Sequence, residues 1–117
     1  MDNSYKWAGG GFLSTSEDLV RFGFAHIQPG LLKPETVEML WTSQKTTSGE
    51  ETGYGIGWRS GTDDSGRRWA GHGGGSVGGR TFLRIYPEEQ TVVVIITNMS
   101  NVRYGDVAEK IAGLFIE

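Results

Sequence analysis

Hydrophobic residues recur with a helical period in the first third of the chain. Val20, Phe24 and Ile27 share one face of a helix predicted over residues 15–27. Ser14-x-x-Glu17 is a capping box, in which the two side chains satisfy free N–H groups at a helix start. We therefore expect a helix that begins close to Ser14 and packs through this apolar face.

A second helix is predicted directly afterwards, so that residues 15–41 form a helical segment. Lys33-Pro34-Glu35 marks its start, because proline is favoured in the first turn of a helix. Val37, Leu40 and Trp41 form its apolar stripe. The entry segment, residues 1–13, is expected to be extended and to end in glycines.

The period changes to that of strands over residues 54–98. Val92 to Ile96 is apolar at every position, which is typical of a strand covered on both faces. Turn-forming residues separate the predicted strands, as in Asp63-Asp64-Ser65-Gly66. The strands expected from this pattern are Tyr54–Arg59, Trp69–His72, Arg80–Tyr86 and Thr91–Thr97.

A final helix is predicted over residues 106–117, with Asp106 as its cap and Val107, Ile111 and Leu114 on one face. The order of elements predicts an α+β fold. Two N-terminal helices and one C-terminal helix would pack on an antiparallel sheet of about four strands. The length of 117 residues leaves room for a single domain, residues 1–117.

Composition excludes several function classes. The net charge is −3, which disfavours nucleic acid or an anionic membrane as a partner. There is no cysteine, and the two histidines, His26 and His72, do not have the spacing of a metal site. Residues 1–7 lack the apolar stretch of a signal peptide, so the sequence as it stands predicts a cytoplasmic location. No cofactor is called for.

Glycine is the anomaly, with 19 residues where about 7% is average. Six glycines lie in the nine residues from Gly71 to Gly79. Gly73-x-Gly75-x-x-Gly78 matches a dinucleotide fingerprint, but a strand and not a helix is predicted after it. Gly74-x-Ser76-x-Gly78 matches a nucleophile elbow, but no histidine follows Ser76. A glycine-rich hairpin is the remaining structural interpretation.

Four segments in order resemble one enzyme superfamily. His72-Gly73-Gly74 looks like the third motif of serine β-lactamases and penicillin-binding proteins, in the branch where His-x-Gly replaces Lys-Thr-Gly. That branch contains class C-like β-lactamase-related esterases and D-peptidases. The other similar segments are the glycine-rich loop and helix at Ala8–Phe22, Tyr54-Gly55-Ile56-Gly57-Trp58 before the third motif, and the last hairpin and strand at Pro87–Asn98.

The resemblance implies a partial β-lactamase/transpeptidase-like fold and a site on the third-motif strand. In the family this strand hydrogen-bonds the bound acyl group, so Gly73, Gly74, Gly75 and Ser76 would bind substrate, with the Gly75 N–H as one of two oxyanion donors. His72 would lie near the nucleophile and polarise it or move a proton. The alternative for His72 is a histidine at a strand end that bonds only the backbone.

The first two family motifs are absent from the printed sequence. No serine is followed by lysine three positions later, and there is no Tyr-x-Asn. Thr42-Ser43-Gln44-Lys45 is the nearest match to the nucleophile motif. The chain thus resembles the C-terminal third of such an enzyme, with one wall of the active site and without the wall that holds the nucleophile.

Three functions follow from this pattern. The first is a truncated serine-hydrolase relative that is catalytically silent alone. The second is a module whose glycine strand binds a peptide or acyl compound. The third is a hydrolase that uses Ser76 or Thr42, or that another chain completes. The missing strands and helices of the family fold would leave a sheet face or edge exposed, so we also expect a homo-oligomer.

Overall fold

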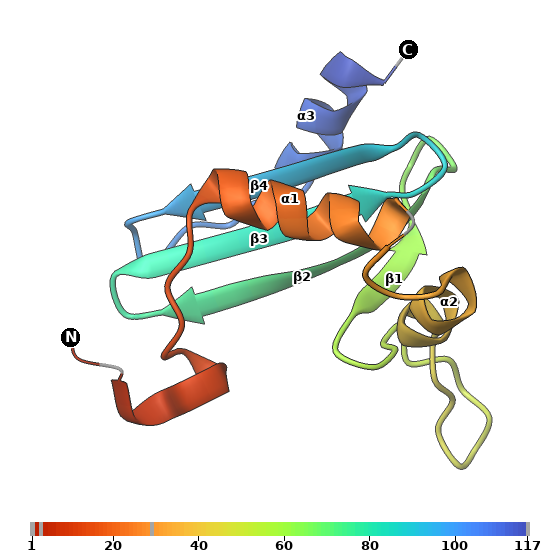
Figure 1. The fold of residues 1–117 in the computed structure, drawn as a ribbon, viewed down its shortest axis with the longest axis horizontal. Helices are drawn as coiled ribbons and strands as arrows, with labels where there is room; N and C mark the ends of the chain where they lie inside the picture. The colour runs from red at the N-terminus through yellow and green to blue at the C-terminus, as the bar shows by residue number, and fades with distance from the viewer. Residues whose placement is uncertain (1, 3, 29, 117) are drawn as a thin grey trace.

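The computed structural model describes residues 2, 4–28 and 30–116, and it has the predicted α+β fold (Figure 1). Among these residues, a short 3-10 helix and two helices precede four strands and a final helix. The elements are η1 (Ser4–Gly9), α1 (Ser16–Ile27), α2 (Pro34–Trp41), β1 (Arg59–Thr62), β2 (Arg68–Ser76), β3 (Gly79–Tyr86), β4 (Thr91–Thr97) and α3 (Val107–Phe115).

The four strands form one antiparallel sheet in sequence order, β1-β2-β3-β4. A two-residue turn, Val77-Gly78, closes the long β2–β3 hairpin, since Ser76 pairs with Gly79. Gly78 has a φ of 82°, which glycine adopts at little cost. A strand therefore follows the glycine run, as predicted, and the helix that a dinucleotide fingerprint needs is absent from this part of the described chain.

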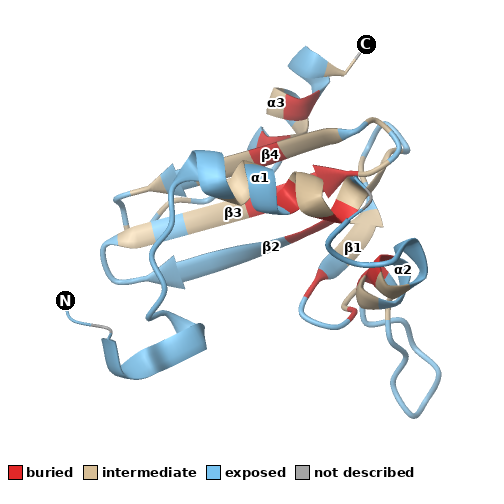
Figure 2. Ribbon diagram, viewed as in Figure 1, coloured by how far each residue is buried: buried red, intermediate tan, exposed pale blue. Residues whose placement is uncertain are grey.

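Helices cover both faces of β4, which confirms the interpretation of its continuous apolar run. On one face Val92 and Val94 pack with α1 and α2 around Ile85, which is fully buried. On the other face Val93 packs with Ala108 and Ala112 of α3, which are also fully buried. Figure 2 shows buried residues where the helices pack on the sheet, whereas the outer part of β2 and the turn after it are exposed.

Helix α1 begins one residue later than we predicted. Its cap is Thr15, whose hydroxyl oxygen accepts from the Asp18 N–H at 3.1 Å, so the Ser14-x-x-Glu17 capping box was wrong. Of the predicted apolar face, Ile27 packs against the core, whereas Val20 and Phe24 are half-buried. Gly23, which is not part of the predicted face, lies against β4, where an added Cβ would be 2.6 Å from Val92 Cγ1. The helix approaches the sheet too closely for a larger residue there.

The segment before Arg59 is not a strand, which corrects the predicted strand Tyr54–Arg59. Gly53 and Gly57 have φ values of 67° and 76°, and the Gly55 N–H donates to the Trp58 carbonyl at 2.7 Å. These turns fold the chain back, so that only an isolated bridge joins Tyr54 to Arg59. The strand begins at Arg59, where the turns end.

Strand β2 is longer than predicted, because pairing with β3 carries it through the glycines to Ser76. The entry segment is also corrected, since Ser4–Gly9 is a 3-10 helix with the Ser4 N–H bonded to Asp2 Oδ1; residues 1 and 3 lie outside the described residues. Helix α3 begins at Val107. Asp106 is at the N-cap position, as predicted, but its side chain makes no capping bond and pairs with Lys110 at 2.7 Å. Residue 117 is not described.

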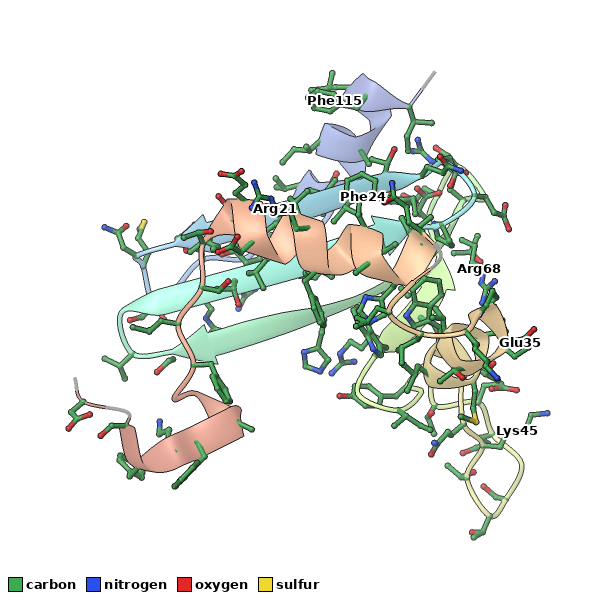
Figure 3. All side chains as sticks on the ribbon, in the orientation of Figure 1. Arg21, Phe24, Glu35, Lys45, Arg68 and Phe115 are labelled. Carbon is green, nitrogen blue, oxygen red and sulfur yellow. The ribbon has the colours of Figure 1, made fainter. Side chains whose placement is uncertain are left out.

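Several large apolar side chains remain exposed outside the core. Leu13 is 97% exposed after η1, and Leu114 is 82% exposed near the end of α3. Phe115 lies beside it at the end of the helix that is far from the sheet (Figure 3). Trp7 is also exposed, in contrast to Trp41 and Trp58, which are core residues.

Candidate functional site

The outer half of β2 has a neighbouring strand on one side only. β1 pairs with β2 as far as Arg59 opposite Gly71, whereas β3 pairs with β2 through Ser76. Residues 72–76 therefore form an open strand edge within the described chain. The exposed end of β2 in Figure 2 is this segment.

The ladder fixes which backbone groups face the open edge. The two-residue turn makes Ser76 and Gly79 a hydrogen-bonded pair, and such pairs recur at every second residue. Gly74 and His72 are thus bonded to β3, and Gly73 and Gly75 direct their N–H and C=O groups away from it. On the other side of β2, the Asp63 N–H donates to the Arg67 carbonyl, so Arg67 directs its backbone groups toward β1. Counting every second residue from Arg67 along β2 again leads to Gly73 and Gly75.

His72 lies at the inner end of this edge and is held by two hydrogen bonds. Its Nδ1 is 2.6 Å from the Gly73 carbonyl oxygen, and its Nε2 is 2.8 Å from the Tyr54 hydroxyl oxygen. A carbonyl only accepts, so Nδ1 carries a proton. In the neutral ring Nε2 is then the acceptor, and the Tyr54 hydroxyl donates to it. The two rings meet edge to face at 5.7 Å.

His72 and the glycines also line a cavity of about 350 Å³ between α1 and the sheet. Phe22, Trp58 and Leu83 supply its apolar walls, whereas His72 supplies a polar group. A second hollow of about 560 Å³ lies between the η1 segment and the β2–β3 hairpin, and residues 72–79 line it. The predicted residues His72, Gly73, Gly74, Gly75 and Ser76 therefore lie together along one strand, beside space for a small ligand.

The segment after β4 that contains Ser100 and Tyr104, which we call the strap, is hydrogen-bonded to the tip of the β2–β3 hairpin. The Gly78 N–H donates to Ser100 Oγ at 2.7 Å, and Arg80 Nε donates to the Ser100 carbonyl at 2.8 Å. The Tyr104 hydroxyl donates to the Arg80 carbonyl at 2.9 Å. Because Arg80 pairs with Gly75, these bonds hold the strand opposite the open edge.

The two candidate nucleophiles have different surroundings. Ser76 ends β2 on the face of the strand that carries His72, four residues away. Thr42 lies at the end of α2, where its hydroxyl donates to the Glu38 carbonyl at 2.7 Å. Lys45 pairs with Glu51 at 3.3 Å. The structure does not place the Thr42-x-x-Lys45 segment along the cavity that His72 lines.

His26, the other histidine, is a core residue of α1. It is buried, its ring forms a cluster with those of Trp41 and Trp58, and its Nδ1 bonds the Phe22 carbonyl at 2.8 Å. Among the described residues, no group of three or more histidines, aspartates or glutamates could hold a metal ion. No described helix is long and apolar enough to cross a membrane.

Asp63, in the β1–β2 turn away from this edge, is a carboxyl group whose pKa the fold lowers. Burial of the Asp63 side chain opposes its ionisation. The N–H groups of Arg67 and Ser65 donate to it at 2.9 Å and the Arg67 guanidinium at 3.0 Å, and together they lower its pKa. This turn sets the β1–β2 register, so it determines that Arg59, the first residue of β1, lies opposite Gly71, where the open edge begins.

Sequence reasoning missed one member of the site, Tyr54. We took it for a half-buried strand residue, but it lies in the turn region and reaches His72. Eighteen residues separate the two, and no regular periodicity connects them. The glycines at 53, 55 and 57 were the available signal, because they allow the chain to fold back toward β2.

Comparison with known proteins gives a consistent result at three levels. The beta-lactamase family model matches residues 1–113. The human and mouse mitochondrial serine beta-lactamase-like proteins LACTB are each 37% identical over 96% of this chain, which spans about a quarter of their length, 27%. A solved D-stereospecific amidohydrolase from Streptomyces superposes with a TM-score of 0.61 at 24% identity, over 74% of this chain and 26% of that one. At that identity the likeness shows the fold.

Proposed function

The chain belongs to the beta-lactamase family, and from this we propose that it forms the substrate-facing wall of a serine hydrolase and does not turn over substrate alone. The observation that carries the proposal is the open edge of β2 at residues 72–76, with His72 at its inner end. An acyl or peptide ligand binds there as an added strand, through the N–H groups of Gly73 and Gly75 and the C=O group of Gly75.

The glycines themselves support a ligand role, because packing does not require all of them. A Cβ at Gly73 would meet Phe82 Cδ2 at 3.5 Å, an ordinary contact. A Cβ at Gly75 would meet no backbone atom and only the guanidinium of Arg80, at 2.6 Å, which would have to shift at the expense of its bond to the Ser100 carbonyl. A Cβ at Gly71 would lie 2.3 Å from the Leu83 carbonyl oxygen, where the backbone blocks it. Gly71 is thus explained by the sheet, whereas Gly73 and Gly75 are explained by close approach of a ligand.

In this proposal the Gly75 N–H is an oxyanion donor. It points to the open edge and is fixed by the ladder, which is the preorganisation that stabilises developing negative charge. One such donor contributes about 10²–10³ in rate. The second donor of the family is the N–H of the nucleophile, which the Ser-x-x-Lys motif would supply and the printed sequence lacks. The chain therefore binds an acyl group without attacking it.

Intact mass measurement tests the catalytic part of the proposal. The chain is incubated with a fluorophosphonate and, in a separate sample, with a penicillin. We expect an unmodified mass in both samples, because Thr42 is bonded to a carbonyl and Lys45 to Glu51. A stoichiometric adduct at Ser76 or Thr42 would identify a working nucleophile and overturn this part, in favour of a hydrolase complete in one chain.

Binding is tested with an acyl-D-alanine amide, a probe suggested by the name of the Streptomyces amidohydrolase. We expect backbone amide shifts at Gly73 and Gly75 in a nitrogen-15 NMR titration. Gly75→Pro removes the N–H at an edge position, where proline is tolerated, and it should weaken binding. Gly75→Ala keeps the N–H and is the matched control. Equal binding by both variants would exclude the Gly75 N–H as a donor.

Completion of the site by further protein is the second part of the proposal. The exposed apolar residues Leu13, Leu114 and Phe115 offer surface for association of copies of this chain, as the missing family elements led us to expect. Static light scattering at micromolar concentration measures this directly. A clean monomer would refute the homo-oligomer and would leave the ligand-binding proposal intact.

A further inference from the structure

Tyr54 has a role at the edge that the three comparisons do not assign. It is the side chain that contacts His72 most directly, and it comes from the turn region between α2 and β1. Its hydroxyl lies 2.8 Å from His72 Nε2. The Arg59 guanidinium lies over the Tyr54 ring, 5.6 Å from its centre. The ring is thus held from two sides.

The two hydrogen bonds of His72 form a chain in which each donor points the same way, from Tyr54 through the His72 ring to Gly73. Tyr54 donates to Nε2, and Nδ1–H donates to the Gly73 carbonyl at 2.6 Å. Which ring nitrogen carries the proton is set by the bond that the other nitrogen makes. We propose that Tyr54 is a positioning residue that holds His72 as the Nδ1–H tautomer, with its ring along the open edge. The positioning role itself is independent of the proposed function. Only its purpose, to present the His72 ring to a ligand at the open edge, rests on that function.

The arrangement has a consequence for His72 as a proton carrier. Nδ1 is directed into the strand, so protons exchange with the site through Nε2 and therefore through the Tyr54 hydroxyl. The oxygen of that hydroxyl keeps the capacity to accept a hydrogen bond from a neighbouring group. His72 also occupies the Gly73 carbonyl, so that the Gly73 N–H, Gly75 N–H and Gly75 C=O are the edge groups left for an incoming strand.

Nitrogen-15 NMR of the histidine rings tests the proposal in the full chain. The sequence has two histidines, and His26 is an internal reference, because its Nδ1 bonds the Phe22 carbonyl away from Tyr54. On the alkaline side, where imidazole is neutral, His72 of the wild type should be predominantly the Nδ1–H tautomer. In Tyr54→Phe the ratio of Nε2–H to Nδ1–H should rise about two- to tenfold, which is the factor for one net hydrogen bond.

Tyr104→Phe is the matched control. It also removes a phenol hydroxyl that bonds the hairpin, but the bond goes to the Arg80 carbonyl and not to His72. The tautomer ratio of His72 should be unchanged in this variant, and that of His26 should be unchanged in both. Tyr54→Phe keeps the ring and its contact with Arg59, and an amide correlation spectrum reports whether the fold is retained.

A measurement on the wild type alone gives a second test that needs no variant. The Tyr54 hydroxyl proton should be observable and should show a nuclear Overhauser contact to the His72 ring. The proposal is overturned by a wild-type His72 that is mainly the Nε2–H tautomer, or by a ratio that Tyr54→Phe leaves unchanged. These results are independent of the acyl-D-alanine amide titration, so failure of the positioning role and failure of the proposed ligand are distinguishable.

Discussion

Gly73→Ala should make the protein more stable, although it lies in the run of glycines at the candidate site. Gly73 is absent from the residues with positive φ, so alanine can adopt its backbone conformation. The added Cβ would make contacts at 3.5 Å and 3.6 Å with Phe82 and the Thr81 carbonyl, which are ordinary van der Waals distances. Replacing glycine under these conditions stabilises a protein by about 0.4–1 kcal/mol, because the unfolded chain loses freedom.

Gly71→Ala is the control in the same strand, and its sign is opposite. Its Cβ would lie 2.3 Å from the Leu83 carbonyl oxygen and 3.2 Å from Arg84 Cα, which are backbone atoms of β3. The hairpin must shift to admit it, and overpacking of this kind costs about 1–3 kcal/mol. The two alanine variants should thus differ by about 1.4–4 kcal/mol in the free energy of unfolding.

Urea and thermal unfolding measure both variants against the wild type. At about 4–8 °C per kcal/mol, Gly73→Ala should raise the Tm by about 2–8 °C, and Gly71→Ala should lower it by more than 4 °C. The acyl-D-alanine amide titration should at the same time show weaker binding to Gly73→Ala. If Gly73→Ala unfolds as easily as Gly71→Ala, packing requires both glycines, and the inference of a ligand from Gly73 is wrong.

Two further predictions concern the support of the edge. Asp63→Asn should destabilise the protein by about 1–3 kcal/mol at neutral pH, because a buried carboxylate loses charge-assisted bonds. Since folding lowers the Asp63 pKa below 3.8, its stabilisation is present above pH 3.8 and is lost as pH falls through the folded value. Urea titrations between pH 2 and 6 should show this loss in the wild type only. Ile85→Ala should cost about 2–5 kcal/mol, since Ile85 is fully buried in the α1 core, and a smaller change in urea unfolding would indicate that the core collapses around the site.

The regular parts of the fold could be predicted from the sequence because local physics decides them. Proline at the start of α2, the apolar run of β4 and the turn before Thr91 each act within a few residues. Errors occurred where a tertiary contact overrides the local pattern. Gly23 lies against the sheet because α1 approaches Val92 closely, and this close approach cannot be read from the apolar pattern of the helix.

The sequence could predict the strand that carries the candidate site, but it could not predict the side chains from other segments that contact this strand. The glycine run places His72, Gly73 and Gly75 in order on one strand, whatever their surroundings. Tyr54 reaches His72 only because the turns at Gly53 and Gly57 reverse the chain. Turns of this kind have no period, so the predicted strand Tyr54–Arg59 concealed the contact that orients the histidine.

A site made of backbone groups depends on residues that never touch the ligand. The direction of the Gly75 N–H is a property of the ladder, and the ladder at that point is held through Arg80, its partner in β3. Arg80 is fixed in turn by Ser100 and Tyr104, which come from the strap after β4. Side-chain substitutions at the edge leave the N–H in place, whereas loosening the strap would move it. The chain therefore positions its candidate donor through residues about 25 positions later in the sequence, and the strap and the β1–β2 turn together determine where the open edge begins and ends.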